Sequence, residues 1–541
     1  MMAYTRGQGR EAVRYGILVL GLSATFLGFV AGGDSGVSEY LIPKAAALNA
    51  TAFACLLVGA WSARELRAGP ADLFVLGSLL LTVLAALNSP APATGLTASG
   101  IAVSFAVVFW SCRGAVRAGR GGLLLALAAA AVVLAAVVSL LDAYGAPGVA
   151  AIESRPGGTF GNRNRLAHIL ALGLPLLLVQ ALSAETRRRF TAYSVALVPV
   201  MAALALSRCR GAWLSTLVVV PLTLWLWRRG EAGPARAAAP RRLAILMALA
   251  AGSAAAAILL PNDLDWRGAH PYRHSLETLL DGRTGTGAGR LLQYRNTSRM
   301  IFDHPLLGVG PGQWTIRYPE YSPSGDPNFE HANLLPVTRL PQSDWFGLAA
   351  ERGIPAALCW LLLLLAAVAP CAGLVKQEHA VPPERLRAVL LGGSVALGAI
   401  VMGTVDALVM TPGAAFWMAL ALGVCASTSG WSRAVHVPRA GRAACLVPLL
   451  LLTATIGTLS VGELAAVREY AGGGAEALER GLRINPRDYR ARILLANELV
   501  ATKRCDEAAA HIDAAEAWIP SASAIAKMRK KCASPWLQGR P

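Results

Sequence analysis

Apolar stretches of about 17 to 23 residues follow one another from about residue 12 to about residue 462, and each is long enough to cross the hydrocarbon core of a bilayer as a helix. The pattern predicts a polytopic bundle of about 13 membrane-spanning helices. We place the spans at residues 12–31, 45–63, 71–87, 96–112, 121–141, 166–183, 190–206, 211–228, 243–261, 353–375, 388–408, 413–430 and 443–462.

Two long polar regions complete the chain. One is a loop at 262–341, after the ninth span, and the other is the tail at 463–541. A loop of this length is uncommon in a compact domain and is usually functional. The sequence therefore predicts an all-α fold in two parts: a membrane domain at 1–462 that includes the large external loop, and a C-terminal α-helical repeat domain at 463–541.

Basic residues are distributed unevenly between the two ends of these spans. If the N-terminus is cytoplasmic, roughly 22 arginines and lysines lie in inside segments and roughly 6 in short outside loops, which is the asymmetry that orients helices during insertion. This orientation places the large loop and the tail on the outer face. For a cell inner membrane protein, that face is periplasmic.

Composition agrees with a membrane protein. The 541 residues are 55% hydrophobic and 15% charged, so no separate soluble core is needed. The net charge of +18 is carried largely by the predicted cytoplasmic loops, where it meets anionic lipid, and nucleic acid is not an expected partner. The first span lacks a signal-peptide cleavage site. The nine cysteines show no metal-ligand spacing, so we expect neither a metal nor another cofactor.

The tail contains a repeat. Pro486 and Pro520 lie 34 residues apart and each closes a helical pattern. At the same offset Leu478 matches Ile512, Gly481 matches Ala515 and Gly474 matches Ala508. This period predicts tetratricopeptide-like helical hairpins that bind a protein partner, although an unrelated pair of hairpins would give a similar pattern. Cys505 and Cys532 could pair in an oxidising compartment.

Two motifs place arginines on the predicted outer face. GGTFGNRNRLAHIL, at 157–170, is a glycine-rich turn with Arg163 and Asn164 just before a helix, an arrangement suited to binding phosphate. SRCRGAWLS, at 207–215, contributes Arg208 and Arg210. Basic residues are disfavoured on this face during insertion, so they indicate an anionic partner. The alternative is that Arg208 and Arg210 extend to lipid headgroups.

Two more motifs lie in and after the large loop. GRLLQYRNTSRMIFDHPLLGVGPGQW, at 289–314, predicts an amphipathic helix that contains Arg290, followed by a tight glycine turn. HANLLPVTRLPQSDWFGLAAERGIP, at 331–355, predicts a helix that leads into the tenth span, with Gln342, Asp344 and Trp345 near its start. An acidic side chain in a first helical turn is also explained by the helix dipole alone.

In order and spacing, these four motifs resemble the bacterial O-antigen ligase and O-antigen polymerase superfamily over residues 155–420. The resemblance implies a GT-C-like fold and an inverting, metal-independent glycosyltransferase. Such an enzyme moves a glycan from an undecaprenyl diphosphate carrier to a lipid or glycan acceptor at the outer face of the inner membrane. It also implies that Arg210 and Arg290 hold the diphosphate, with Arg163, Asn164, Arg208, Asp344 and Trp345 as further substrate-binding residues.

The chain departs from the family at one position. The histidine thought to engage the acceptor hydroxyl corresponds to Gln342, whose amide forms hydrogen bonds but takes up no proton near neutral pH. His331 is the alternative source of a base. Two alternative functions also remain open besides polymerase: a non-catalytic relative that binds carrier lipid and recruits partners through its tail, and a transporter. A transporter would have charged residues in mid-span, and Asp406 is the main intramembrane acid.

Overall fold

A computed structural model describes residues 2–29, 40–59, 66–146, 155–266, 270–277, 285–323, 326, 340–376, 381–428, 433–435, 438–518 and 523–533. The bundle consists of α1 (Met2–Leu27), α2 (Leu41–Gly59), α3 (Pro70–Leu87), α4 (Pro92–Arg117), α5 (Gly121–Ala143), α6 (Arg163–Leu182), α7 (Arg187–Ser207), α8 (Arg210–Gly230), α9 (Gly233–Leu259), α14 (Ile354–Lys376), α15 (Pro383–Gly403), α16 (Pro412–Thr428) and α17 (Arg439–Tyr470). The remaining elements are the 3₁₀ turn η1 (Gly158–Phe160), α10 (Pro271–Glu277), α11 (Gly285–Asp303), α12 (Trp314–Tyr321), α13 (Asp344–Arg352), α18 (Gly474–Ile484), α19 (Tyr489–Ala501), α20 (Cys505–Trp518) and α21 (Ser523–Ala533).

The predicted spans all coincide with helices. Among the described residues, 11 helices are long and apolar enough to cross a membrane, and two shorter apolar helices, Ala12–Leu27 and Pro412–Thr428, occupy the first and twelfth predicted spans. The all-α, multi-pass fold is confirmed. One small addition is a pair of three-residue strands, β1 (Leu66–Ala68) and β2 (Arg433–Val435), which pair antiparallel.

Burial separates central helices from peripheral ones. In α6, 94% of the most apolar window is buried inside the protein, whereas in α9 the share is 11%. A helix that is apolar on all sides is stable at the centre of the bundle or facing lipid, because apolar side chains pack well against protein and against lipid tails. α6 packs against α7, α8, α15 and α16, so it lies among other helices of the bundle.

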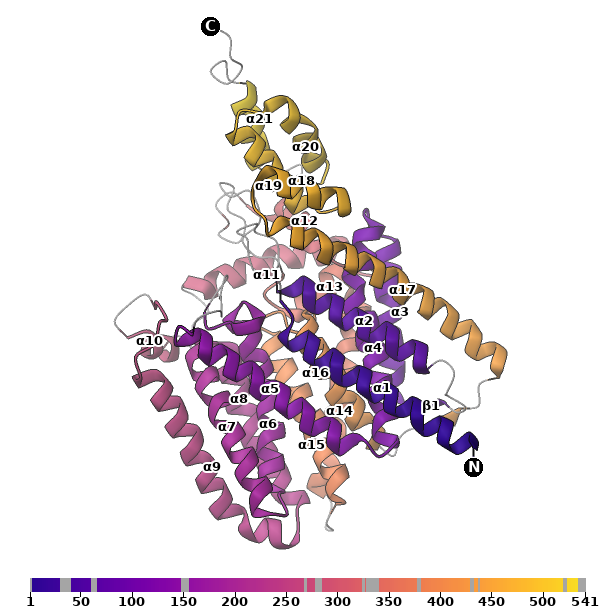
Figure 1. Cartoon of the computed structure of the whole chain (residues 1–541), viewed down its shortest axis with the longest axis vertical. Coiled ribbons are helices and arrows are strands. Elements are labelled where there is room, and N and C mark those ends of the chain that lie inside the picture. The colour runs from indigo at the N-terminus through magenta and orange to yellow at the C-terminus, as the bar shows by residue number, and fades with distance from the viewer. Residues whose placement is uncertain are drawn as a thin grey trace.

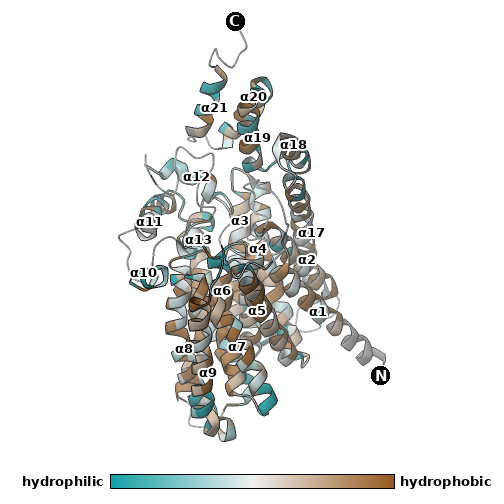
Figure 2. Ribbon diagram, turned by 60° about the vertical axis from the view of Figure 1, so that its left-hand side comes forward, coloured by the Kyte–Doolittle hydropathy of each residue, from teal (hydrophilic) through white to brown (hydrophobic). Residues whose placement is uncertain are grey.

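The polar helices gather at one end of this bundle. α11, α12 and α13 lie between the bundle and the tail helices, α10 lies apart from the tail beside the end of α9, and the N-terminus lies toward the opposite end of the bundle (Figure 1). Colouring by hydropathy shows the same division, with apolar residues along the bundle and polar residues in the tail and at the ends of the long helices (Figure 2). We call the end that carries α10 to α13 the loop face.

The tail has an apolar core of its own. Its buried residues include the 34-residue pair Leu478 and Ile512, and Ala515, the partner of Gly481. A Cβ on Gly481 would lie 2.1 Å from the ring of Tyr470, so the helix crossing there requires glycine. Ile316 of α12 belongs to the same core, which ties the tail to the large loop.

α17 continues unbroken through residue 462 into the tail. The domain boundary and the tetratricopeptide assignment therefore stay predictions. Pro520 lies outside the described residues.

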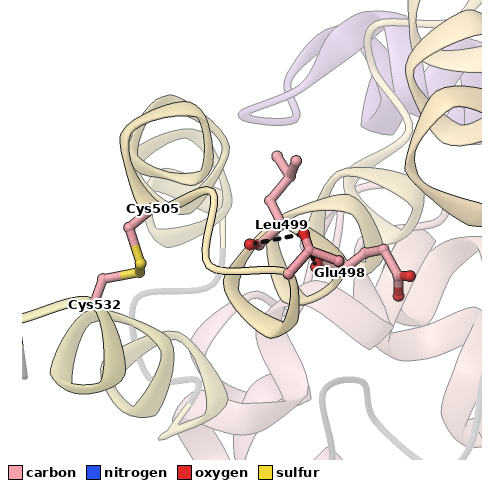
Figure 3. Close-up of a disulfide and its surroundings, with 5 residues drawn as sticks. Glu498, Leu499, Cys505 and Cys532 are labelled. Atoms are coloured by element: carbon pink, nitrogen blue, oxygen red, sulfur yellow. Dashed lines mark hydrogen bonds between the residues drawn. A yellow bond between two sulfur atoms is a disulfide. The ribbon is translucent and has the colours of Figure 1, made fainter. Parts of the chain in front are cut away.

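The two tail cysteines form a disulfide. Cys505 begins α20 and Cys532 lies near the end of α21, with Cα atoms 5.5 Å apart (Figure 3). The bridge joins two successive helices across a separation of 27 residues. Closing a loop of this length removes entropy from the unfolded chain, so the bond stabilises the end of the tail.

We expect the double variant Cys505→Ala with Cys532→Ala to lower the free energy of opening α20 and α21 by about 2 to 4 kcal/mol. Hydrogen exchange on the purified protein measures this directly. Cys445→Ala, which changes an exposed free cysteine of α17, is the control and should leave exchange unchanged. Equal protection of α20 and α21 in the double variant would contradict a stabilising role for the bond.

Candidate functional site

A short segment between α15 and α16, residues 404–411, lies beside the starts of three helices. At α6, Asn164 Nδ2 donates to Asp406 Oδ2 at 3.4 Å. At α13, Asp344 Oδ1 accepts hydrogen bonds from the backbone amides of Leu408 and Val409, both at 2.9 Å. At α8, a Cβ on Gly211 would lie 3.0 Å from Val405 Cγ2. The positive dipole ends of all three helices thus lie around one segment, an arrangement that favours an anion.

The start of α6 is set by a side-chain cap. Asn162 Oδ1 accepts hydrogen bonds from the backbone amides of Asn164, at 2.9 Å, and Arg165, at 3.4 Å. Gly161 precedes the cap with φ 64°, a conformation that favours glycine. A Cβ at Gly161 would also collide with the ring of Tyr40. The glycine-rich motif therefore fixes where α6 begins and the direction in which the side chains of Arg163 and Asn164 project.

Two motifs that are distant in the sequence meet at Gln342. Arg290 Nε, on α11, donates to Gln342 Oε1 at 3.1 Å, and the Gln342 backbone amide donates to Gln293 Oε1 at 2.6 Å. The Tyr294 hydroxyl lies 2.8 Å from the carbonyl oxygen of Gln342 and 2.9 Å from that of Thr404. The predicted residues Arg290 and Gln342 are therefore in direct contact, and Tyr294 links them to the segment 404–411.

Asp406 is the acidic group of this site. Its Oδ2 lies 3.3 Å from His168 Nε2, and its side chain is 21% exposed, whereas that of His168 is 1% exposed. Burial acts to raise the pKa of Asp406, but the neighbouring His168 and Arg290 outweigh burial and lower it. Asp406 is therefore an ionised carboxylate that solvent or a substrate can reach.

Cys209 approaches the same imidazole, with Sγ 4.0 Å from His168 Nε2. The carboxylate and the thiol thus face one nitrogen of His168. A nucleophilic triad needs them on opposite nitrogens, because the imidazole must pass a proton between them. The arrangement does not suit covalent catalysis by Cys209.

His168, Cys209 and Asp406 also form a candidate metal-ligand set, since their ligand atoms lie within 4.8 Å of one another. The buried Nδ1 of His168 has no hydrogen-bond partner among the described residues. A metal-bound histidine almost always donates its second N–H to an acceptor. The geometry therefore favours a hydrogen-bonded cluster over a metal centre.

Asp344 and Trp345 occupy positions beneath this surface. Burial raises the pKa of Asp344 to about 7, although the hydrogen bonds from Val409 and Leu408 act in the opposite direction. Its oxygens hold the backbone of the segment 404–411, and Trp345 packs against the apolar core of the bundle. Asp344 therefore positions the segment 404–411, and the substrate-binding role expected of Asp344 and of the half-buried Trp345 stays a prediction.

Arg163 and Arg208 form a second basic group. Their guanidinium carbons lie 4.8 Å and 4.7 Å from the ring centroid of Trp266. Arg208 Nε also donates to Ser275 Oγ of α10 at 3.0 Å. Arg208 has φ 52°, which is uncommon outside glycine and marks a residue whose surroundings determine its backbone. The large loop thus folds back over the two motifs at 157–170 and 207–215.

Arg210 and His331 complete the set of predicted catalytic residues. Arg210 is the first residue of α8, adjacent to Gly211 and hence beside the segment 404–411. His331 lies outside the described residues. Sequence reasoning did not assign His168 or Asp406 to the site. The sequence signals were present, since His168 lies within the glycine-rich motif and Asp406 is an acid at the end of an apolar span.

Fold and site together define a polytopic, all-α membrane protein with an arginine-rich polar site on one membrane face. Residues 194–361 match the family model described as O-antigen ligase. The chain is thus similar to the O-antigen ligase superfamily over a segment that contains Arg208, Arg210, Arg290, Gln342 and Asp344. This match supports a membrane glycan-transfer function in O-antigen pathways, with a lipid-linked glycan and membrane lipid as substrates. A search of curated proteins found no match.

Proposed function

We propose that this protein is an O-antigen ligase-like glycosyltransferase that moves a glycan from undecaprenyl diphosphate to an acceptor at the outer face of the inner membrane. The contact between Arg290 and Gln342 is the observation that carries the proposal. It brings a guanidinium of the large loop to the three helix starts around residues 404–411. The match to the O-antigen ligase family over residues 194–361 supports the same reading.

The diphosphate binds between Arg210 and Arg290 in this proposal. Arg290 donates to Gln342 through Nε, so its two terminal nitrogens, Nη1 and Nη2, can donate to two phosphate oxygens in parallel. Negative charge grows on the departing diphosphate as the bond to the sugar breaks. Fixed guanidinium groups and helix starts stabilise that charge without rearrangement, so the reaction needs no metal ion for this purpose.

The acceptor hydroxyl attacks the anomeric carbon from the face opposite the diphosphate. A new carbon–oxygen bond forms, the bond to the diphosphate oxygen breaks, and the configuration inverts. The hydroxyl proton passes to a base, for which we propose Asp406 because its carboxylate is ionised and partly exposed. Gln342 is then a positioning residue that orients Arg290.

The alternative, a carrier-binding relative without activity, is favoured by one observation: the family histidine is replaced by Gln342. One assay separates the two. Purified protein in lipid nanodiscs is mixed with an undecaprenyl diphosphate oligosaccharide and candidate lipid or glycan acceptors, and release of carrier diphosphate is measured. Release that depends on the acceptor supports the transferase. Carrier binding with no release for any acceptor refutes it, and elongation of the glycan itself would indicate a polymerase.

Orientation in the membrane follows from the same proposal. With the N-terminus cytoplasmic, the loop face and the tail are periplasmic, and a disulfide in the tail is compatible with that oxidising compartment. Single cysteines at Phe302, which is 79% exposed, and at Glu507 should react with an impermeant maleimide added outside spheroplasts. A cysteine at the exposed Ala237 should react only after the membrane is permeabilised. The reverse labelling pattern would overturn the orientation.

A further inference from the structure

Arg163 and Arg208 form a basic pair that the transfer mechanism leaves unused. Both guanidinium groups face Trp266, and that of Arg208 also lies 5.8 Å from the ring centroid of Tyr272. Both arginines are half-buried, and neither forms an ion pair with an acid in the described part of the chain. Aromatic faces supply only partial negative charge. The two positive charges therefore stand together without a counter-ion from those residues.

The two charges also oppose each other. Burial lowers the pKa of Arg208, and the positive charge of Arg163 lowers it further, while Tyr272 acts in the opposite direction. No carboxylate of the described residues offsets this repulsion. A ligand that brings negative charge to both guanidinium groups removes it, so the pair favours a bound anion.

The terminal nitrogens of the pair are available to such a ligand. Arg208 donates to Ser275 Oγ through Nε, and its two terminal nitrogens have no hydrogen-bond acceptor among the residues that the structure describes. The guanidinium of Arg163 makes no hydrogen bond to the same residues. Both side chains are partly exposed, and none of these nitrogens is sealed from solvent. A phosphate or carboxylate can therefore accept two parallel hydrogen bonds from one guanidinium while it faces the other.

The large loop encloses the pair and disfavours a lipid headgroup as the anion. The guanidinium of Arg208 does not extend toward lipid but donates to Ser275, which is buried in α10. Trp266 Nε1 donates to the hydroxyl of Tyr272 at 3.2 Å, so the ring beside both arginines is itself fixed by the loop. We therefore expect the anion to lie beneath the loop, where a substrate binds.

The position of the pair indicates which substrate carries the anion. Arg163 directly precedes Asn164, whose Nδ2 donates to Asp406 from the start of α6. Arg290 reaches the segment 404–411 from α11 instead, and α10 lies apart from α11 beside the end of α9 (Figure 1). In the proposed transfer the acceptor hydroxyl meets Asp406, and the diphosphate departs with Arg290 from the opposite face of the sugar. An anion at the pair then belongs to the acceptor.

We propose that Arg163 and Arg208 bind a phosphate or carboxylate group of the acceptor saccharide, so that the enzyme selects an anionic acceptor. The proposal rests on glycan transfer as the proposed function. The oxyanion accepts hydrogen bonds from the terminal nitrogens of both arginines, and Trp266 holds the two guanidinium groups in place.

Binding is measured with full-length protein in phosphatidylcholine nanodiscs, by saturation-transfer NMR with glucose, glucose 6-phosphate and glucuronate. At least one of the two anionic sugars should bind about ten-fold or more tightly than glucose. Arg163→Met and Arg208→Met should each remove this preference. The corresponding lysine variants should retain part of it, because the charge stays but the paired donors are lost. Arg273→Met changes a 76% exposed arginine of α10 that pairs with Glu277, and it should have no effect.

Inorganic pyrophosphate, added to the same preparations, distinguishes the acceptor from the carrier. Its binding depends on Arg210 and Arg290 in the proposed function, so it should be unchanged in Arg163→Met and Arg208→Met. Unchanged binding also shows that each variant is folded, and where it is lost the lysine variants decide. Weaker binding of pyrophosphate alone in the methionine variants would assign the pair to the carrier and overturn the proposal.

Kinetics with a phosphorylated or carboxylated acceptor test the same site during turnover. Arg208→Met should raise the KM for the acceptor about ten-fold or more and leave the KM for the carrier unchanged. Equal binding of glucose and both anionic sugars by the wild-type protein would overturn the site. So would a preference that persists in both methionine variants, or one that phosphatidylglycerol in the nanodiscs abolishes by occupying the pair. A preference that requires both arginines, in a protein that never releases carrier diphosphate, refutes the transferase and retains the anionic-saccharide site.

Discussion

Arg290→Lys is expected to lower the rate of glycan transfer by about 30- to 1,000-fold, which corresponds to about 2 to 4 kcal/mol of transition-state stabilisation. Arg290 performs two tasks through different nitrogens: Nε holds Gln342, and the terminal nitrogens are proposed to bind the diphosphate. A lysine ammonium is a single point donor and cannot reproduce both contacts. Release of carrier diphosphate under saturating acceptor measures the loss, and Arg210→Lys should fall in the same range.

Matched variants show whether this loss is specific. Arg299→Lys changes an exposed arginine of the same helix and should retain wild-type turnover. Gln342→Ala should cost less, about ten-fold, because Arg290 stays present but loses one orienting hydrogen bond. Wild-type rates in both Arg210→Lys and Arg290→Lys would show that the diphosphate does not bind between these two arginines.

The membrane helices were predictable because each depends on local composition. A window of about 20 apolar residues must become a helix in a bilayer, whatever its neighbours are. That rule identified both α6 and α9, although one is central and the other peripheral, and it began α9 ten residues late, at 243 instead of Gly233. It could not distinguish them, because packing position depends on contacts between helices and not on the hydropathy of one helix.

The candidate site was predictable only in part. Arg210 and Arg290 stand out in the sequence, Arg210 by its place on the predicted outer face and Arg290 by its motif. The placement of Asp406 near them depends on how the segment 404–411 packs against α6, α8 and α13, which no single motif encodes. The contact between Arg290 and Gln342 likewise joins residues 52 positions apart. Such pairings follow from the tertiary fold.

The role of Gln342 changes once these contacts are known. A glutamine in the family's histidine position suggests a lost base when the motif is considered alone. In the structure its side-chain oxygen accepts from Arg290 and its backbone is held by Gln293 and Tyr294. We therefore infer that proton transfer and orientation belong to different residues in this chain, with Asp406 as the candidate base.

Asp406→Asn is expected to lower transfer by about 100- to 10,000-fold, the usual contribution of a positioned general base. The amide keeps the size of the side chain and can still bond to His168, so the loss reports the missing carboxylate. Asp506→Asn, an exposed aspartate of the tail, should be neutral. Turnover of Asp406→Asn close to wild type would exclude this carboxylate as the base.

The pH profile gives an independent check. Asp344, whose pKa burial raises to about 7, adds a limb near that pH whichever residue is the base. Asp406, whose pKa is lowered, stays deprotonated as the pH falls and adds no limb above the ordinary carboxyl value of about 3.9. A histidine base would instead lose activity on the acid side of about pH 6.5. A limb near that value that disappears in His331→Ala would assign the base to His331 and contradict the role of Asp406.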